Sequence, residues 1–254
     1  MLQPRYFELI LYKTYADLRT ETEKTYIGFL WWVIDPIIFM AIFYVVFGLL
    51  LNRGTADFVA FLLIGLVAWR WFQNTVTHGA NALVDNRNLM RQVYIPKIVF
   101  PLVTICTDFV KFCFVFVLLL VYLWLSGYPV NVSYLALPML LITQLLLILA
   151  TTCFVAAVVP FFPDLRIFVQ HIMQAAFFLS GIFFSSEKIP EAYRVYFYAN
   201  PMANLIEAYR DILLHGRWPS LSALTIIGLS SLIAFIGAHR LLMRYDYTYP
   251  KIAY

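Results

Sequence analysis

Charged residues are scarce in this chain of 254 residues: Asp, Glu, Lys and Arg make up 13% of it, about half the share of ordinary soluble domains. Hydrophobic residues account for 63%. A soluble protein of this composition has too few polar side chains to cover its surface, and a disordered chain needs low hydrophobicity. The composition excludes both classes and predicts a protein whose main solvent is lipid. The net charge of +4 forms no basic stripe, so we expect no nucleic-acid partner.

Cysteine is also scarce, and its three copies lie inside apolar segments. On one helix Cys106 and Cys113 would be about 10 Å apart, too far for a disulfide bond, so we expect inert thiols. The first thirty residues contain eight charged residues and no apolar signal-peptide core. We therefore expect the first membrane span to double as the targeting signal.

Motifs of common active sites are missing from the sequence. It contains no Gly-x-x-x-x-Gly-Lys-Ser/Thr phosphate loop, which argues against ATP hydrolysis by this chain through that loop. It also lacks the Gly-x-Ser-x-Gly and His-Glu-x-x-His motifs. None of the four histidines has a partner at metal-ligand spacing: His78, His171, His215 and His239. We predict a non-catalytic chain without a metal site or bound cofactor.

Apolar runs of about twenty residues recur along the chain and predict membrane-spanning helices. Pro160 and Pro163 end the fourth run, because proline cannot continue a helix. We therefore predict an all-α membrane protein with a single transmembrane domain over residues 1–254. Its six expected spans cover residues 30–51, 58–77, 98–125, 134–159, 167–184 and 221–243.

The distribution of Lys and Arg predicts the orientation of these spans. With the N-terminus inside, eleven of these residues fall on the cytoplasmic side and five outside, while Arg70 and Lys111 lie within spans. Cytoplasmic loops carry the excess of positive charge. Both termini are therefore predicted to be cytoplasmic.

Three polar segments are not expected to span. Residues 4–20 place Phe7, Leu11, Tyr15 and Leu18 on one helical face, which predicts an amphipathic helix at the membrane surface. Residues 81–97 predict a short cytoplasmic surface helix that ends before Pro96. Residues 185–220 are expected to form external helices at about 190–198 and 201–214, the second starting with Pro201 after Asn200.

Arg70 has the largest unfavourable free energy of membrane insertion within the predicted spans, since a central Arg costs about 2.5–3.5 kcal/mol on the insertion scale. Gln73, Asn74, Thr77 and His78 continue its polar face. Two interpretations stay open: Arg70 snorkels or pairs structurally, or it lines a substrate path. Asp108 and Lys111 are three residues apart on the third predicted span, and we expect them to form a structural ion pair.

The fifth predicted span mixes polar and aromatic residues. His171 and Gln174 lie among several phenylalanines, so we expect this helix in a bundle interior, where the polar groups join helices or serve a substrate. Most aromatic residues of the chain fit packing and interfacial belts. The remainder could stack on the faces of sugar rings without any acid or base.

Several segments taken together resemble a known family. They are Tyr26–Trp32 with Asp35-Pro36, Phe61–Leu66 with Trp69, Asn88–Lys97, Pro163–Arg166, Asn200-Pro201 and Glu207–Arg210. Their order over nearly the whole chain resembles the membrane-spanning permease of ABC type-2 exporters, in the branch that moves O-antigen, capsular polysaccharide or teichoic acid.

The resemblance implies a homodimer that encloses a channel in the bacterial cytoplasmic membrane. Two copies of a separate subunit would bind ATP and Mg²⁺, and the substrate would be an undecaprenyl-type lipid-linked glycan. In such exporters the N-terminal helix and the loop between spans two and three contact the ATPase. On this chain the resemblance assigns that contact to Arg87, Asn88, Arg91 and Gln92, with Glu21, Glu23 and Lys24 as weaker candidates.

The resemblance also implies a gate and a lid. Spans one and five of opposing subunits are similar to a lateral gate, and the external helices resemble a lid on the exit, with Asn200, Pro201, Glu207 and Arg210 as candidate residues. Arg70 departs from the family pattern, where a small or neutral residue is expected. The candidate lining residues are Trp31, Trp32, Tyr44, Arg70, Gln73, His171, Gln174, Phe177, Phe178, Phe183 and Phe184.

Three other functions compete with this interpretation. A drug or small-lipid exporter would share the fold, and a passive channel would need no ATPase. A membrane enzyme that acts on lipid-linked sugars would need paired catalytic groups, and Asp35, Asp108 and Asp164 are too isolated in the sequence to supply them.

Overall fold

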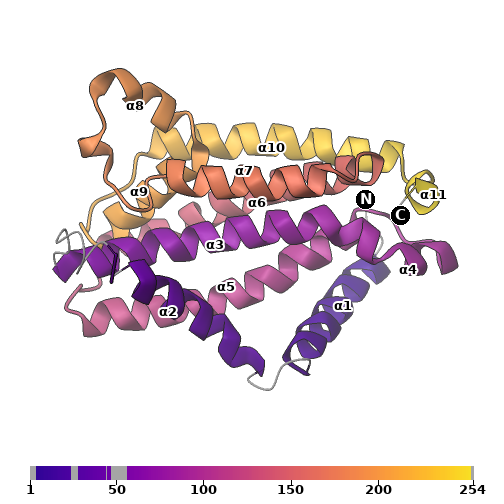
Figure 1. Ribbon diagram of the computed structural model, residues 1–254, viewed down its shortest axis with the longest axis horizontal. Helices are drawn as coiled ribbons and strands as arrows, with labels where there is room; N and C mark the ends of the chain where they lie inside the picture. The colour runs from indigo at the N-terminus through magenta and orange to yellow at the C-terminus, as the bar shows by residue number, and fades with distance from the viewer. Residues whose placement is uncertain (1–3, 24–27, 44, 47–55, 253–254) are drawn as a thin grey trace.

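The computed structural model describes residues 4–23, 28–43, 45–46 and 56–252, and the described part of the chain is helical, without a β-strand (Figure 1). The all-α prediction is therefore confirmed. The α-helices are α1 (Pro4–Glu23), α2 (Trp31–Phe43), α3 (Ala56–Asp85), α4 (Arg87–Gln92), α5 (Val99–Leu125), α6 (Leu137–Val158), α7 (Leu165–Leu179), α8 (Glu191–Tyr198), α9 (Pro201–Leu213), α10 (Leu221–Arg244) and α11 (Tyr249–Ile252). Short 3₁₀ turns are η1 (Gly28–Leu30), η3 (Val132–Ala136), η4 (Val159–Phe161) and η5 (Ser186–Lys188).

Four described segments are long and apolar enough to cross a membrane: Asp57–Gln92, Val99–Leu125, Val132–Phe161 and Leu221–Arg244. They match the second, third, fourth and sixth predicted spans. α2 has 13 described residues and α7 has 15, or about 20 and 22 Å of helix, short of a hydrocarbon core of about 30 Å. The six-span arrangement therefore stays a prediction.

Two helices end at other residues than the predicted spans, whose bounds in the membrane stay predictions. α3 continues past residue 77 to Asp85, because Ala80, Ala82 and Leu83 pack into the core and keep this polar stretch helical. The short surface helix predicted within residues 81–97 is consequently only α4. α7 ends at Leu179 instead of residue 184, because the chain turns at Gly181 with a φ of 70°, a conformation that side chains with a Cβ rarely adopt.

α3 lies at the centre of the bundle. It packs against α5, α6, α7 and α9, while α6 packs along α10. One crossing is very close: a Cβ atom added to Gly79 would lie 2.2 Å from Cγ2 of Thr152 on α6. Membrane helices gain from such small residues, since close backbones increase van der Waals contact.

α1 packs against α5 with one face and leaves the other face free of the bundle. Ile10 and Thr14 are buried, whereas Phe7, Leu11 and Tyr15 of the predicted apolar face are exposed. An apolar face that points away from the protein fits the headgroup region of a membrane. This arrangement supports the predicted role of α1 as an interface helix.

α8 and α9 agree closely with the two external helices expected at 190–198 and 201–214. α9, however, folds back into the bundle, where most of its residues are buried. The Tyr209 hydroxyl donates a hydrogen bond to Oε1 of Gln144 on α6 (2.7 Å), and Nε2 of Gln144 donates to the Ala68 carbonyl of α3 (2.8 Å). α9 therefore packs inside the bundle, joined to α3 and α6.

The two ends of the molecule carry different elements. Figure 1 places α4 and α11 at one end and α8 at the other. We call them the α4 end and the α8 end. Which of them faces the cytoplasm stays a prediction from the count of Lys and Arg.

Candidate functional site

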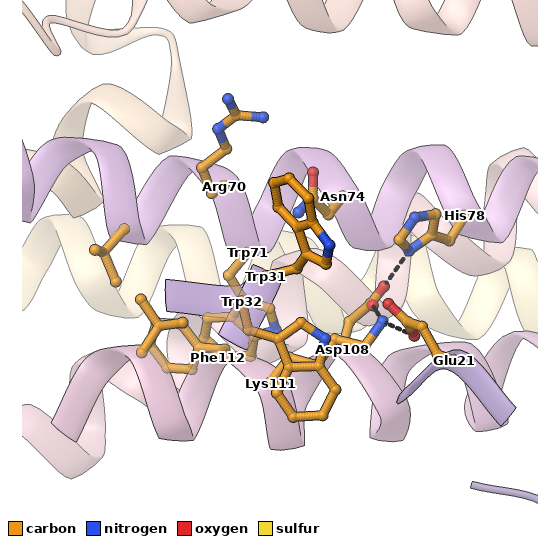
Figure 2. Close-up of a pocket in the computed structure, with 12 residues that line it drawn as sticks. Glu21, Trp31, Trp32, Arg70, Trp71, Asn74, His78, Asp108, Lys111 and Phe112 are labelled. Carbon is orange, nitrogen blue, oxygen red and sulfur yellow. Dashed lines mark hydrogen bonds and ion pairs between the residues drawn. The ribbon is translucent and has the colours of Figure 1, made fainter. Parts of the chain in front are cut away.

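Four charged or titratable side chains from three helices form an ion cluster beside α1 (Figure 2). Nδ1 of His78 on α3 lies 2.9 Å from Oδ2 of Asp108 on α5. Nζ of Lys111 lies 3.5 Å from Oδ1 of Asp108 and also pairs with Oε2 of Glu21 on α1. The predicted Asp108–Lys111 pair is therefore confirmed, and the fold extends it to His78 and Glu21.

A cavity of about 280 Å³ lies next to the ion cluster. The indole of Trp71 stacks on the Phe112 ring with centroids 4.0 Å apart, and Nζ of Lys111 lies 5.8 Å from the Trp32 ring centroid. Aromatic faces beside a few hydrogen-bonding groups make a surface suited to sugars. The lining residues are Glu21, Trp31, Trp32, Val67, Arg70, Trp71, Asn74, His78, Asp108, Lys111, Phe112 and Val115.

A second, more polar cavity of about 670 Å³ adjoins the ion cluster and shares all four of its side chains. Its remaining lining residues come from α1, α3 and α5 and the residue after α3: Lys13, Asp17, Thr20, Asn81, Ala82, Asp85, Asn86, Thr104 and Thr107. The ion cluster therefore borders both a polar cavity and an indole-lined cavity. A carboxylate as buried as Asp108 is tolerated because it has charged and hydrogen-bonding partners.

The candidate lining residues divide between two places. Arg70 lines the smaller cavity with Trp31 and Trp32, and in Figure 2 its guanidinium points away from the ion cluster. Gln73 does not line this cavity, because its Oε1 accepts a hydrogen bond from the Trp69 indole at 2.9 Å. Tyr44 lies outside the described residues.

α7 lies on the surface of the described chain, since none of its residues is buried. His171 and Gln174 are exposed. The described part of this chain alone does not cover the helix, so its predicted place in a bundle interior stays a prediction that needs a second copy.

The phenylalanines at the end of α7 form an aromatic group beside α3. The Phe177 ring lies 6.2 Å from Trp69, 5.2 Å from Phe178 and 5.1 Å from Phe183, measured between centroids. Phe184 instead lies 6.0 Å from Phe197 of α8. The fold thus groups these rings separately from the indoles that line the smaller cavity.

Arg210 forms what we call the Arg210 clamp near the α8 end. Its guanidinium donates to the carbonyl of Phe61 (3.2 Å) on α3 and to those of Gly181 (2.8 Å) and Ile182 (2.9 Å) after α7. It also lies 3.3 Å from the centroid of the Phe61 ring. Arg210 was counted among the external cations, and which side of the membrane it faces stays a prediction; the side chain is buried and ties α9 to two other segments.

The other predicted lid residues also connect α9 to the segment after α7. Asn200 caps α9 by accepting from the Met202 amide at 3.0 Å, and its Nδ2 donates to Oγ of Ser180 at 2.8 Å. Pro201 occupies the first turn of the helix as predicted. Glu207 accepts a hydrogen bond from the Ser186 hydroxyl. The fold therefore gathers all four candidates around one junction.

α4 presents the main predicted docking residues on its exposed surface. Arg87, Asn88, Arg91 and Gln92 are exposed, while Met90 points into the core. The weaker candidates on α1 are already paired, since Glu23 accepts from Arg19 at 2.7 Å and Glu21 pairs with Lys111. Lys24 lies outside the described residues.

Sequence reasoning missed the pairing of Lys111 with Glu21, that of His78 with Asp108, and the carbonyl partners of Arg210. The first two pairings could have been predicted from the sequence, because an Asp within a membrane span needs partners and the chain offers few titratable groups. The carbonyl partners carry no sequence pattern. Among the described residues no group of three or more His, Cys, Asp and Glu side chains could hold a metal ion.

The fold defines a multi-pass helical membrane protein with an ion cluster between an indole-lined cavity and a more polar one. Residues 21–214 match the ABC-2 type transporter family, and the chain belongs to that family. It is 26% identical over 211 residues to the O-antigen export system permease protein RfbA of Klebsiella pneumoniae, covering 83% of this chain and 82% of the relative. It is 26% identical over 236 residues to RfbA of Myxococcus xanthus, covering 92% and 91%. The polysialic acid transport protein KpsM of Escherichia coli is 24% identical over 226 residues, covering 87% of each chain.

Proposed function

We propose that this chain is the membrane-spanning permease of an ATP-driven exporter that moves a lipid-linked, O-antigen-like polysaccharide across the bacterial cytoplasmic membrane. The observation that carries the proposal is its similarity, along most of its length, to permeases named for O-antigen export. The lipid carrier is of the undecaprenyl type. The chain itself is not an enzyme, which agrees with its missing phosphate loop.

Energy enters through a separate cytoplasmic subunit that binds ATP and Mg²⁺, in two copies for a homodimer of this chain. The exposed cations of α4 support a docking site there, because α4 directly follows the long central helix α3. A movement of the docked subunit is thereby passed to α3, which contacts α2, α4, α5, α6, α7 and α9. Coupling of this kind requires two arrangements of the bundle that bind the partner differently.

The second copy of the chain covers the exposed side of α7. This helix exposes polar and aromatic groups together, which suits a helix that faces a wet path between two subunits. α7 and α2 of opposing subunits form the lateral gate, while α8 and α9 form the lid. The indole-lined cavity holds sugar rings by stacking, with Asn74 and the ion cluster supplying hydrogen-bond partners.

The proposal is tested by purifying the tagged chain from its host in mild detergent and identifying the proteins that accompany it. We expect an ATP-binding subunit in equal number, and ATP-dependent uptake of a lipid-linked glycan by inverted vesicles that contain both proteins. If the pair moves a drug or a small lipid but no glycan, the substrate assignment is wrong. Glycan transport by the chain alone, or chemical modification of the glycan, would contradict the assigned subunit role.

A further inference from the structure

We propose that residues 245–252 form, together with α4 and the residues that follow it, one composite surface that binds the cytoplasmic ATP-binding subunit. The inference rests on the proposed function and adds a second element to the docking site. The family resemblance assigned the contact to α4 and to residues near the N-terminal helix only. The composite surface consists of Arg87, Asn88, Arg91, Gln92, Val93, Tyr94, Tyr247 and Lys251, all of which are exposed.

Three contacts join the two parts of the composite surface, although more than 140 residues separate them in the sequence. Nε of Arg91 donates to the carbonyl of Pro250 at 3.1 Å. The backbone amide of Lys97 donates to Oδ1 of Asp246 at 2.8 Å. The rings of Tyr94 and Tyr247 stack with centroids 5.6 Å apart and planes 20° from parallel. Residues 91–97 and 246–250 therefore form one connected unit.

This unit is anchored to the bundle through Tyr249, which is completely buried. Its hydroxyl donates to the Ala157 carbonyl of α6 at 3.1 Å, and its ring lies 5.5 Å from the Phe161 ring of η4. A partner that moves the composite surface therefore acts on α6 as well as on α3. Residues 245–252 give the docking site a second mechanical connection to the bundle.

The exposed chemistry of the surface favours a protein partner. The side chains of Tyr94 and Tyr247 are 53% and 76% exposed beside three cations, Arg87, Arg91 and Lys251. Tyr and Arg are the residue types that most often dominate binding energy at protein interfaces. Because the net charge of these side chains is positive, the matching surface of the partner carries acidic groups around an apolar patch.

Two buried charged residues, Lys97 and Asp246, hold the composite surface rigidly from below. The ammonium group of Lys97 donates to the Ile95 carbonyl at 2.9 Å and lies 5.1 Å from the Tyr94 ring centroid. Burial lowers the pKa of Lys97, and the negative charge of Asp246 opposes that shift. Asp246 therefore stabilises the composite surface in two ways: it accepts from the Lys97 amide, and its negative charge balances the charge of Lys97.

A membrane surface is the competing partner, because aromatic and cationic side chains also suit lipid headgroups. The place of the surface argues against it. Figure 1 shows α4 and α11 at the extreme end of the molecule, away from the sides of the long bundle helices. We therefore assign the surface to the ATP-binding subunit.

The test uses the full chain in detergent and, as the probe, the ATP-binding subunit that co-purifies with the unaltered chain. Tyr247→Glu places a carboxylate on the composite surface, and we expect binding to fall about tenfold, the effect of losing one strong interface residue. The matched control is Tyr196→Glu on α8, whose side chain is also 76% exposed but lies at the other end. Size-exclusion elution of each variant reports its folding.

A second pair of variants tests the connection between the two parts. Asp246→Ala removes the acceptor of the Lys97 amide, whereas Asp246→Asn keeps an oxygen in that place, so we expect Ala to weaken binding more than Asn. Unchanged binding of Tyr247→Glu, while Arg87→Glu with Arg91→Glu abolishes it, would overturn the inference and leave the proposed function standing. An effect of Tyr247→Glu seen only in nanodiscs of anionic lipid, and absent in detergent, would assign the surface to the membrane instead. An unaltered chain that recruits no ATP-binding subunit would remove the proposed function itself.

Discussion

Two cations near opposite ends of α3, the buried Arg210 and the partly buried Lys111, are stabilised in different ways. Arg210, near the α8 end, is held by backbone carbonyls of Phe61, Gly181 and Ile182. Lys111 is held by the carboxylates of Glu21 and Asp108 and borders two cavities. The first arrangement joins three backbone segments, and the second leaves charged groups next to open space. Carbonyl partners therefore make Arg210 a joint between segments, whereas carboxylate partners leave Lys111 in a group of charges that borders two cavities.

The largest expected effect is on the Arg210 clamp. Arg210→Met removes the donors for three buried carbonyls, which lowers the free energy of unfolding by on the order of 3 kcal/mol. Thermal unfolding in detergent, followed by tryptophan fluorescence, measures this loss. Arg210→Lys keeps the charge but lacks the planar group that reaches several carbonyls, so we expect an intermediate value. If the Met variant unfolds at the same temperature as the unaltered chain, the clamp does not stabilise the fold.

A smaller effect is expected from Gly65→Ala, which adds an atom against the same clamp. The new Cβ would lie 2.8 Å from Nη2 of Arg210, so the guanidinium must shift away from its carbonyls at a cost of about 1–3 kcal/mol. Gly237→Ala on α10 is the matched control, because its Cβ would meet no atom within 4 Å. There alanine favours the helix by up to about 1 kcal/mol. Equal melting of the two variants would contradict the tight fit around Arg210.

The smallest expected effect on stability comes from Asp108→Asn in the ion cluster. The amide oxygen still accepts a hydrogen bond, and Glu21 still pairs with Lys111, so the loss is about 1 kcal/mol. We expect ATP-dependent glycan uptake by vesicles to fall more than stability does, because the charge balance beside both cavities changes. Asp57→Asn at the other end of α3 is the control, because this exposed carboxylate lines neither cavity. Normal uptake by the Asp108 variant would class the ion cluster with the Arg210 clamp as structural.

Much of the fold could be predicted from contiguous sequence. Long apolar runs located four spans, and Asn200-Pro201 predicted the start of α9, because a proline at the first helical position and a capping Asn act locally. Asp108 and Lys111 are neighbours on one helix face, so their pairing was also predictable. The end of α7 was not, since the apolar run continues past the turn at Gly181.

The candidate site was less accessible to sequence reasoning. Trp31, Trp32 and Arg70 were proposed as lining residues because polar and aromatic groups are unusual at those positions. The structure places all three around one cavity. Gln73 was proposed on the same grounds but bonds to Trp69 of its own helix. The polar face of a helix can be predicted from spacing, but the neighbour that meets it cannot.

The sequence by itself determined which segments leave water and where many helices begin or end. Both follow from transfer free energy and local backbone preferences, which depend on neighbouring residues along the chain. Only the tertiary structure decided that α9 returns into the bundle, that Arg210 binds carbonyls, and that residues 245–252 meet the loop after α4. These contacts join groups far apart in the chain, and every backbone carbonyl looks alike in sequence, so only the packing of helix faces selects among them.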